Sequence, residues 1–178
     1  PWSERKDLFF VGGYQHPPNI DAAQWFVGSI WPLIREQLPG VEFHLIGSKA
    51  TDAVRALDGN GVRFQGFVES MEPWLDNCRL AVAPLRYGAG IKGKVNMSMS
   101  HGQPVVATPM AVEGMFAEPG RDVLVAETAE EFAAEVVRVY QDEDLWNLVS
   151  VSGQENVNRY FSVETARLGL QELLTSLT

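Results

Sequence analysis

Short apolar runs alternate along this chain with longer stretches in which apolar residues recur at the helical spacing. The runs are rich in β-branched and aromatic residues, and most are bounded by Gly or Pro, which is typical of strands. Several are apolar at successive positions, which indicates a sheet covered on both faces, as parallel sheets are. The pattern predicts strands over residues 8–13, 42–47, 62–67, 79–84, 104–108 and 122–125.

The stretch between the first two strands predicts a long helix. Asn19 is the expected N-cap and Gly40 the expected stop. Pro32 predicts a kink, because proline lacks an N–H and clashes with the preceding turn. The apolar positions that follow the helical period are Ala23, Phe26, Val27, Ile30, Ile34 and Leu38.

Residues 91–102 fit two structures, because Val95, Met97 and Met99 alternate as they would in a strand. We predict a helix, since Gly102 can end it and since neighbouring parallel strands need a crossover between them. A short helix is expected over residues 70–77. After residue 126 the chain turns helical, with a capping box at Thr128, a helix over 145–161, and a last helix over 163–175 capped by Ser162.

This alternation of strands and helices predicts an α/β fold: a three-layer, doubly wound parallel sheet of about six strands, Rossmann-like, with a helical C-terminal tail. In the common order 3-2-1-4-5-6, ligands bind at the carboxyl ends of the strands, where the winding reverses between strands 1 and 4. The loops that follow these two strands, residues 12–19 and 84–94, should therefore lie beside each other at a ligand site.

Composition narrows the class of protein. A length of 178 residues suits one domain, and the formal net charge of −9 argues against general nucleic-acid binding. Cys78 is the only cysteine, so no disulfide can form within the chain, which fits a reducing, cytoplasmic compartment. No apolar run approaches the ~20 residues that span a bilayer. Because the chain starts at Pro1, we expect it to be one domain of a larger protein.

One window departs from the acidic character of the chain. No Asp or Glu occurs between Asp76 and Glu113, and this window holds a basic, glycine-rich loop. Glycines let a ligand approach the backbone, and the helix that follows offers free N–H groups to an anion. With Gly12 and Gly13 on the opposite wall, the loop predicts a diphosphate site; its residues are Arg86, Gly88, Gly90, Lys92 and Lys94. The alternative is a turn rich in Gly with solvated lysines.

The remaining polar residues yield no catalytic constellation. Glu113 either accepts hydrogen bonds from sugar hydroxyls or pairs with a nearby Lys. His16 and His101 could reach a phosphate or sugar but are more often structural, and His44 lies within a strand. No cluster has metal-ligand spacing, and no Ser-His-Asp set or carboxylate pair falls in the predicted crevice. The site is therefore predicted to bind rather than to perform acid–base chemistry.

The segments "FVGGYQHPPNIDAAQWF", "LAVAPLRYGAGIKGKV" and "HGQPVVATPMAVEGM" occur in an order that resembles the C-terminal domain of retaining GT-B glycosyltransferases. The resemblance is to the group 1 class, glycosyltransferase family four, and covers roughly residues 7–175. It implies that this chain is the donor-binding half of an enzyme in polysaccharide biosynthesis. Such an enzyme transfers a hexose from a UDP- or GDP-sugar to a saccharide or lipid-linked acceptor, with retention and without a metal or other cofactor.

The resemblance also assigns roles to positions of this sequence. The Arg and Lys that often hold the diphosphate fall on Gly13 and approximately Pro18, so Lys94 and Arg86 are expected to stabilise the leaving diphosphate instead. Two expected glutamates fall on Met97 and near Gly88. The neighbouring Asn96 is the candidate for the ribose role. Base contacts are expected from the backbone of Gly66, Phe67 and Val68.

The resemblance further implies a partner domain. An N-terminal domain of the same protein would bind the acceptor and could bring the chain to a membrane. The last helix would pack on that domain, leaving its apolar side chains and Trp2 partly exposed here. Two alternatives stay open: a non-catalytic nucleotide- or sugar-binding module, and a domain like that of UDP-sugar 2-epimerases, which would need carboxylates in the cleft.

Overall fold

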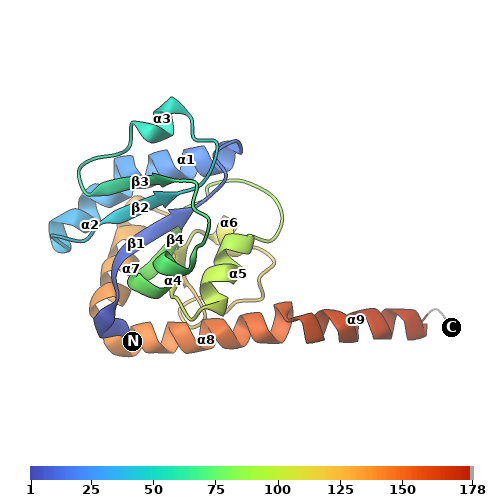
Figure 1. The fold of residues 1–178 in the computed structure, drawn as a ribbon. Coiled ribbons are helices and arrows are strands. Elements are labelled where there is room, and N and C mark those ends of the chain that lie inside the picture. Colours follow the sequence, from blue (N-terminus) through green and yellow to red (C-terminus); the bar gives the residue numbers. More distant parts are fainter. Residues whose placement is uncertain (177–178) are drawn as a thin grey trace.

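Six parallel strands form one sheet in the order β3-β2-β1-β4-β5-β6 in the computed structural model, which describes the backbone of residues 1–176 (Figure 1). Every strand pair in the sheet is parallel. The strands are β1 (Lys6–Val11), β2 (Phe43–Ile46), β3 (Val62–Gly66), β4 (Cys78–Ala83), β5 (Val105–Ala107) and β6 (Leu124–Val125). The predicted fold class and strand order are confirmed.

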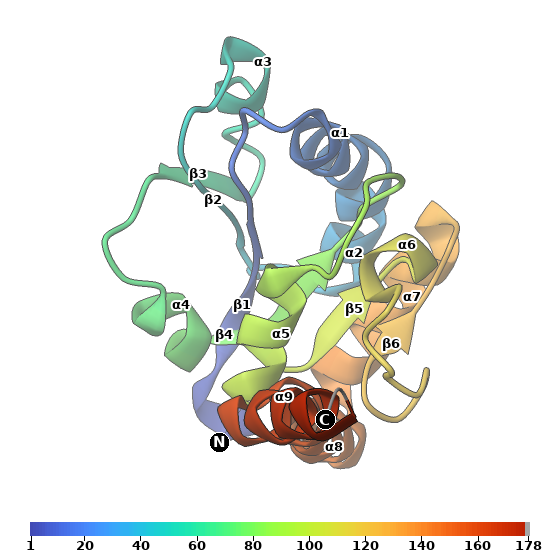
Figure 2. The same ribbon diagram turned by 90° about the vertical axis from the view of Figure 1, so that its right-hand side faces the viewer.

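Helices cover the sheet on both faces (Figures 1 and 2). On one side lie α1 (Pro17–Trp25), the π-helical segment η2 (Phe26–Ile30), α2 (Trp31–Gln37) and α7 (Ala129–Gln141). The Phe26 ring of η2 joins this layer to the sheet, because its centroid lies 4.3 Å from that of Phe43 and 6.0 Å from that of Phe132. On the other side lie α4 (Glu72–Asn77), α5 (Gly93–Ser100) and α8 (Glu143–Phe161).

The first long helix differs from its prediction at both the start and the middle. It begins at Pro17 with His16 in the N-cap position, since proline is well suited to a first helical turn. Asn19 is therefore not the N-cap, which corrects that prediction. The expected irregularity is present, because η2 separates α1 from α2, where Pro32 occupies the first turn. Gly40 follows the end of α2 with φ +87°.

The other helices follow their predictions more closely. Residues 93–100 form a helix, and the Thr128–Glu131 capping box is complete. The last helix, α9 (Val163–Ser176), begins after Ser162, whose Oγ accepts a hydrogen bond of 3.1 Å from the Thr165 amide. The short elements η1 (Trp2–Glu4), α3 (Asp52–Arg55) and α6 (Pro109–Val112) complete the fold.

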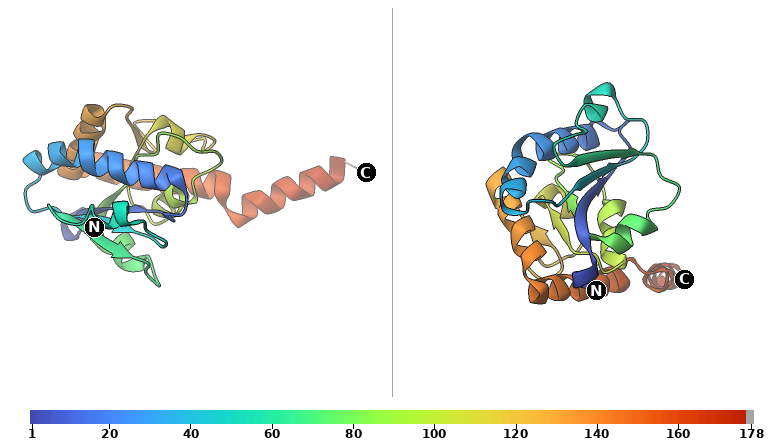
Figure 3. Two further views of the ribbon diagram at one scale, coloured as in Figure 1. Left: turned by 90° about the horizontal axis from the view of Figure 1, so that it is seen from above. Right: turned by 60° about the vertical axis from the view of Figure 1, so that its left-hand side comes forward.

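The two helices α8 and α9 form the C-terminal tail. Helix α8 packs on the domain, and α9 continues from it beyond the sheet (Figures 1 and 3). Several apolar side chains of α9 are exposed: Val163, Leu168, Leu170 and Leu174. Trp2 is half-buried, because its Nε1 donates to the Tyr140 carbonyl at 3.2 Å and Arg79 stacks on its ring. None of the helices that the structure describes has the length and apolarity that a membrane crossing requires.

Candidate nucleotide-binding cleft

A cavity of about 390 Å³ lies at the carboxyl ends of β1, β2 and β3 and beside the start of α5. This is the edge at which the sheet reverses its winding, since β1 pairs with β2 on one side and with β4 on the other. The cavity therefore occupies the position that doubly wound folds use for ligands. Its lining comprises Val11, Gly12, Gly13, Ile46, Gly47, Ser48, Phe67, Val68, Met71, Gly93, Lys94 and Met97.

Backbone forms one wall of this cavity. The Gly12 amide donates to the Ile46 carbonyl at 3.0 Å, and the Gly47 amide donates to the Gly66 carbonyl at 2.7 Å. Gly47 has φ +146°, and a Cβ atom there would lie 1.7 Å from the Gly12 carbonyl oxygen. Only glycine can occupy this position, so the closeness of the two loops depends on it.

Lys94 is the one charged side chain that lines the cavity, within the part of the chain that the structure describes. It belongs to the first turn of α5, and its Nζ lies 4.3 Å from the centre of the Phe10 ring. Its Nζ also donates to Oδ1 of Asn19 at 2.6 Å. Burial, and to a lesser extent the charge of Lys92, lower the pKa of Lys94 to about 7. A bound anion would favour the charged form of such a group.

Arg86, the second predicted diphosphate ligand, is directed elsewhere. Its Nε donates to Oδ2 of Asp21 at 2.9 Å, and its Nη2 donates to Oδ1 of the same carboxylate. The guanidinium also stacks on Trp25, 5.4 Å from the ring centre. Because α1 supplies both partners, the structure does not bring Arg86 into the cavity, which corrects the placement expected from sequence.

The rest of the basic loop lies beside α1 rather than in the cavity. Gly88 and Gly90 have φ +130° and +76°, so both adopt backbone conformations that favour glycine. A Cβ atom at Gly88 would lie 3.7 Å from the ring of Pro18. The Nζ of Lys92 donates to the Gly90 carbonyl, and its charge still reaches Lys94. None of these three residues is part of the cavity lining.

Other predicted contacts are split between the cavity and the surface. Phe67 and Val68 line the cavity, and 74% of the Phe67 surface is exposed. Glu113 is exposed at the end of α6 and Asn96 is half-buried, and neither is part of the lining. Met97 lines the cavity at the position where the resemblance expects a glutamate. The lining thus consists of apolar side chains, glycine backbone, Ser48 and the amine of Lys94.

The three histidines lie outside this lining. His16 occupies the N-cap position of α1 without a side-chain capping bond, and its Nε2 lies 3.1 Å from the side-chain nitrogen of Gln15. His101 Nδ1 lies 2.9 Å from the Met97 carbonyl oxygen, at the end of α5.

The sequence did not predict that Asn19 would contact Lys94, since Asn before a helix normally indicates a cap.

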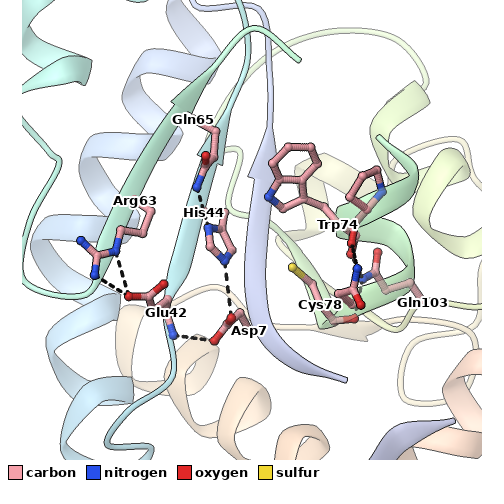
Figure 4. A network of polar contacts seen from close by, with 10 residues as sticks. Asp7, Glu42, His44, Arg63, Gln65, Trp74, Cys78 and Gln103 are labelled. Carbon is pink, nitrogen blue, oxygen red and sulfur yellow. Dashed lines mark hydrogen bonds and ion pairs between the residues drawn. The ribbon is translucent and has the colours of Figure 1, made fainter. Parts of the chain in front are cut away.

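His44 belongs to a polar cluster at the amino ends of the strands, away from the cleft (Figure 4). Ligand atoms of Asp7, Glu42 and His44 lie within 4.8 Å of one another, a grouping that sequence spacing did not reveal because it joins β1 to β2. Arg63 donates to Glu42 at 2.8 Å, and the Gln65 amide lies 3.0 Å from His44 Nδ1. These contacts connect three adjacent strands.

The fold is that of a doubly wound α/β domain, and its cavity lies at the switch point of the sheet. A sequence profile of the family "Glycosyl transferases group 1" matches residues 5–142, and the chain belongs to this family. Its fold is that of the C-terminal, Rossmann-like domain of GT-B glycosyltransferases. This confirms the family resemblance read from the sequence.

A curated protein resembles part of the chain. A Klebsiella pneumoniae protein, described as an uncharacterized 44.6 kDa protein in the cps region, is 22% identical over 140 residues, which are 74% of this chain and 36% of that protein. The chain thus spans about a third of the length of the curated relative that it matches.

Solved structures share the fold at low identity. A variant of S. aureus TarM, in complex with UDP and saccharides, has a TM-score of 0.81 at 18% identity, over 97% of this chain and 35% of that one. Anabaena HepE with UDP and glucose has a TM-score of 0.78 at 17% identity, over 98% and 49%. The C-terminal domain of LpcC from Francisella tularensis has 0.72 at 13%, over 89% and 88%.

Proposed function

We propose that this chain is the donor-binding part of a glycosyltransferase and holds a nucleotide diphosphate sugar in the cleft at the carboxyl ends of β1–β3. The observation that carries the proposal is the position of Lys94: a single ammonium group beside an apolar, glycine-walled cavity at the switch point. The presence of UDP in the structures of TarM and HepE, which share this fold, supports a nucleotide of this class.

The two ends of such a donor suit the two parts of the cleft. The nucleoside is flat and largely apolar on its faces, and Phe67, Val68 and Met71 offer an apolar surface to it. The diphosphate would lie toward Lys94 and the first turn of α5, where helix N–H groups are free to donate. Positive charge placed there would stabilise the negative charge that develops on the leaving diphosphate.

In this proposal Lys94 takes over the charge that the family more often places after the first strand, where this chain has Gly13 and Pro18. A lysine supplies a point charge and needs no metal ion to neutralise the phosphate. We therefore propose that donor binding is independent of divalent metals. Transfer of a hexose with retention, to a saccharide or lipid-linked acceptor, completes the proposed activity.

The proposal also requires a second domain for the acceptor, because the chain covers only part of its relatives. The exposed leucines of α9 are the surface that we propose for contact with that domain. A helix that extends beyond its own sheet with apolar side chains in solvent is a common mark of an interface. We also propose that any association of the complete protein with a membrane depends on this second domain.

Calorimetric titration of the chain with UDP and GDP tests the proposal, using Lys94→Met as the variant and Lys6→Met as the control. Lys6 is exposed at the opposite end of β1, so its loss leaves the cleft unchanged. We expect one nucleotide to bind, and Lys94→Met to weaken binding roughly 10- to 100-fold, as the loss of a charged hydrogen bond does. Equal affinities for the two variants would overturn the assignment.

One observation favours a second candidate, a non-catalytic nucleotide-binding module. The positions where the resemblance expects two glutamates hold Met97 and, approximately, Gly88. Binding of a nucleotide without any turnover of its sugar by the complete protein would select this candidate. An epimerase-like role is less well supported, because no carboxylate is among the described residues that line the cavity.

A further inference from the structure

Asn19 bridges the two loops that meet at the cleft. Its Nδ2 donates to the Gly13 carbonyl at 2.9 Å, and its Oδ1 accepts from Lys94 Nζ at 2.6 Å. Both ends of the side-chain amide are therefore occupied, and this also fixes which atom is oxygen and which is nitrogen. Gly12 makes room for the contact, because a Cβ atom there would lie 2.8 Å from the Asn19 side chain.

We propose that Asn19 is the positioning residue of Lys94: its amide holds the ammonium group at the diphosphate end of the cleft while leaving the positive charge unneutralised. This inference rests on the proposed function, since it specifies how the cleft keeps its single cation ready for the donor.

The chemistry of the side chain matters as much as its position. A carboxylate at this place could also accept from the ammonium, but it would lose the donation to the Gly13 carbonyl, form an ion pair with Lys94 and repel a phosphate. Arg86 shows the contrast nearby, because Asp21 neutralises it two residues further along α1. The neutral amide of Asn19 orients Lys94 without competing for its charge.

The surroundings of Lys94 agree with this role. The Lys94 ammonium lies over the face of the Phe10 ring of β1 and contacts the neutral amide of Asn19 in α1. The charge of Lys92, in the loop before α5, also acts on it. In the described part of the chain, no acidic group contributes to its titration. Its pKa is accordingly lowered to about 7, mainly by burial. Near neutral pH the Lys94 amine is therefore only partly protonated, and an incoming phosphate would stabilise its ammonium form.

The test measures the pKa of Lys94 in the free chain, by NMR of ¹³C-labelled lysine side chains, for the wild type and for Asn19→Asp. The control is Gln24→Glu, which makes the same amide-to-carboxylate change at an exposed position of the same helix. We expect Asn19→Asp to raise the pKa of Lys94 by at least one unit and to weaken UDP binding more than tenfold. Gln24→Glu should leave both nearly unchanged.

Asn19→Ala provides the second variant, because it removes both hydrogen bonds without adding charge. It should weaken UDP binding several-fold while the pKa of Lys94 stays low, and circular dichroism should confirm an intact fold. If both Asn19 variants change stability alone, and the Lys94 pKa and UDP affinity stay as in the wild type, Asn19 is merely structural and the proposal fails. The pKa of Lys94 is measured without ligand, so the two failures can be told apart. If Asn19→Asp raises this pKa but the chain binds no nucleotide, the proposed function is rejected while the contact between Asn19 and Lys94 is supported.

Discussion

Gly47 and Gly12 stand against each other at the carboxyl edge of the sheet, so closely that a Cβ atom on Gly47 would lie 1.7 Å from the Gly12 carbonyl oxygen. The two residues follow adjacent parallel strands, and both line the cleft. Their contact brings the loops after β1 and β2 together and gives the cleft its backbone wall.

We therefore expect Gly47→Ala to destabilise the chain by more than about 3 kcal/mol, because a backbone atom blocks the methyl group and the φ of +146° disfavours any side chain. Gly28→Ala is the matched control, since nothing lies within 4 Å of a Cβ there and the position is helical. It should stabilise by about 0.5–1 kcal/mol. Urea unfolding of both variants measures the difference, and similar midpoints would contradict the close approach.

Donor binding should weaken as the pH rises above neutrality. Lys94 has a pKa lowered to about 7, so the free chain loses this proton above pH 7 while a bound diphosphate favours the charged form. The affinity for UDP-glucose should fall with a slope approaching roughly tenfold per pH unit between pH 7 and 8.5. A sugar nucleotide is the suitable probe, because its phosphates do not titrate in this range. Lys94→Met should abolish the slope, and a persistent slope would assign it to another group.

Titration of Lys94 should affect folding in the opposite direction: donor affinity falls as the pH rises, whereas the stability of the fold increases. The unfolded chain, in which the pKa of Lys94 returns to its ordinary 10.5, binds one more proton than the folded chain between pH 7 and 10.5. The contribution of this residue to the free energy of unfolding therefore rises with pH across that window, and its full cost is present below pH 7. The free energy of unfolding of the wild type, measured relative to that of Lys94→Met, should therefore increase from pH 6.5 to pH 10.

Arg86→Ala should leave nucleotide affinity within about threefold of the wild type, because Asp21 and Trp25 hold the guanidinium outside the cleft. The exposed ion pair should contribute no more than about 1 kcal/mol to folding. Calorimetry with UDP and thermal melts provide the two readouts. Asp21→Asn serves as the partner variant, and its effects should match those of Arg86→Ala. A large loss of affinity in Arg86→Ala alone would mean that the arginine turns to the donor.

Ending the chain after Ser162 should leave the domain folded and its nucleotide affinity unchanged. The helix removed, α9, follows α8 and extends beyond the sheet, and its large apolar side chains that the structure describes are exposed: Val163, Leu168, Leu170 and Leu174. Differential scanning calorimetry should show a melting temperature within ~3 °C of the full chain. A large fall in melting temperature would indicate that α9 supports the core.

The order of the sheet and the place of the cleft could be predicted from local patterns. Apolar runs marked all six strands, and capping residues marked the starts of α7 and α9. Residues 93–100 show the limit of periodicity, since alternating apolar positions fitted a strand and only the need for a crossover favoured a helix. Topology then placed two loops at the switch point.

The sequence could not predict which side chains contact each other. Arg86 and Lys94 look equivalent in a basic loop, yet one pairs with Asp21 and the other enters the cleft. Asn19 was expected to cap a helix, and Pro17 displaced that role, which freed the amide to cross to Lys94. Asp7, Glu42 and His44 meet because two strands pair in one register.

The sequence by itself determined the six strands, their parallel arrangement and the edge of the sheet where the cavity lies, because these depend on hydrophobic period and chain connectivity. Only the tertiary structure decided which cation faces the cleft and which residue holds it. Such contacts join residues far apart in the chain, such as Asn19 and Lys94, and a few ångströms of backbone placement determine whether they form.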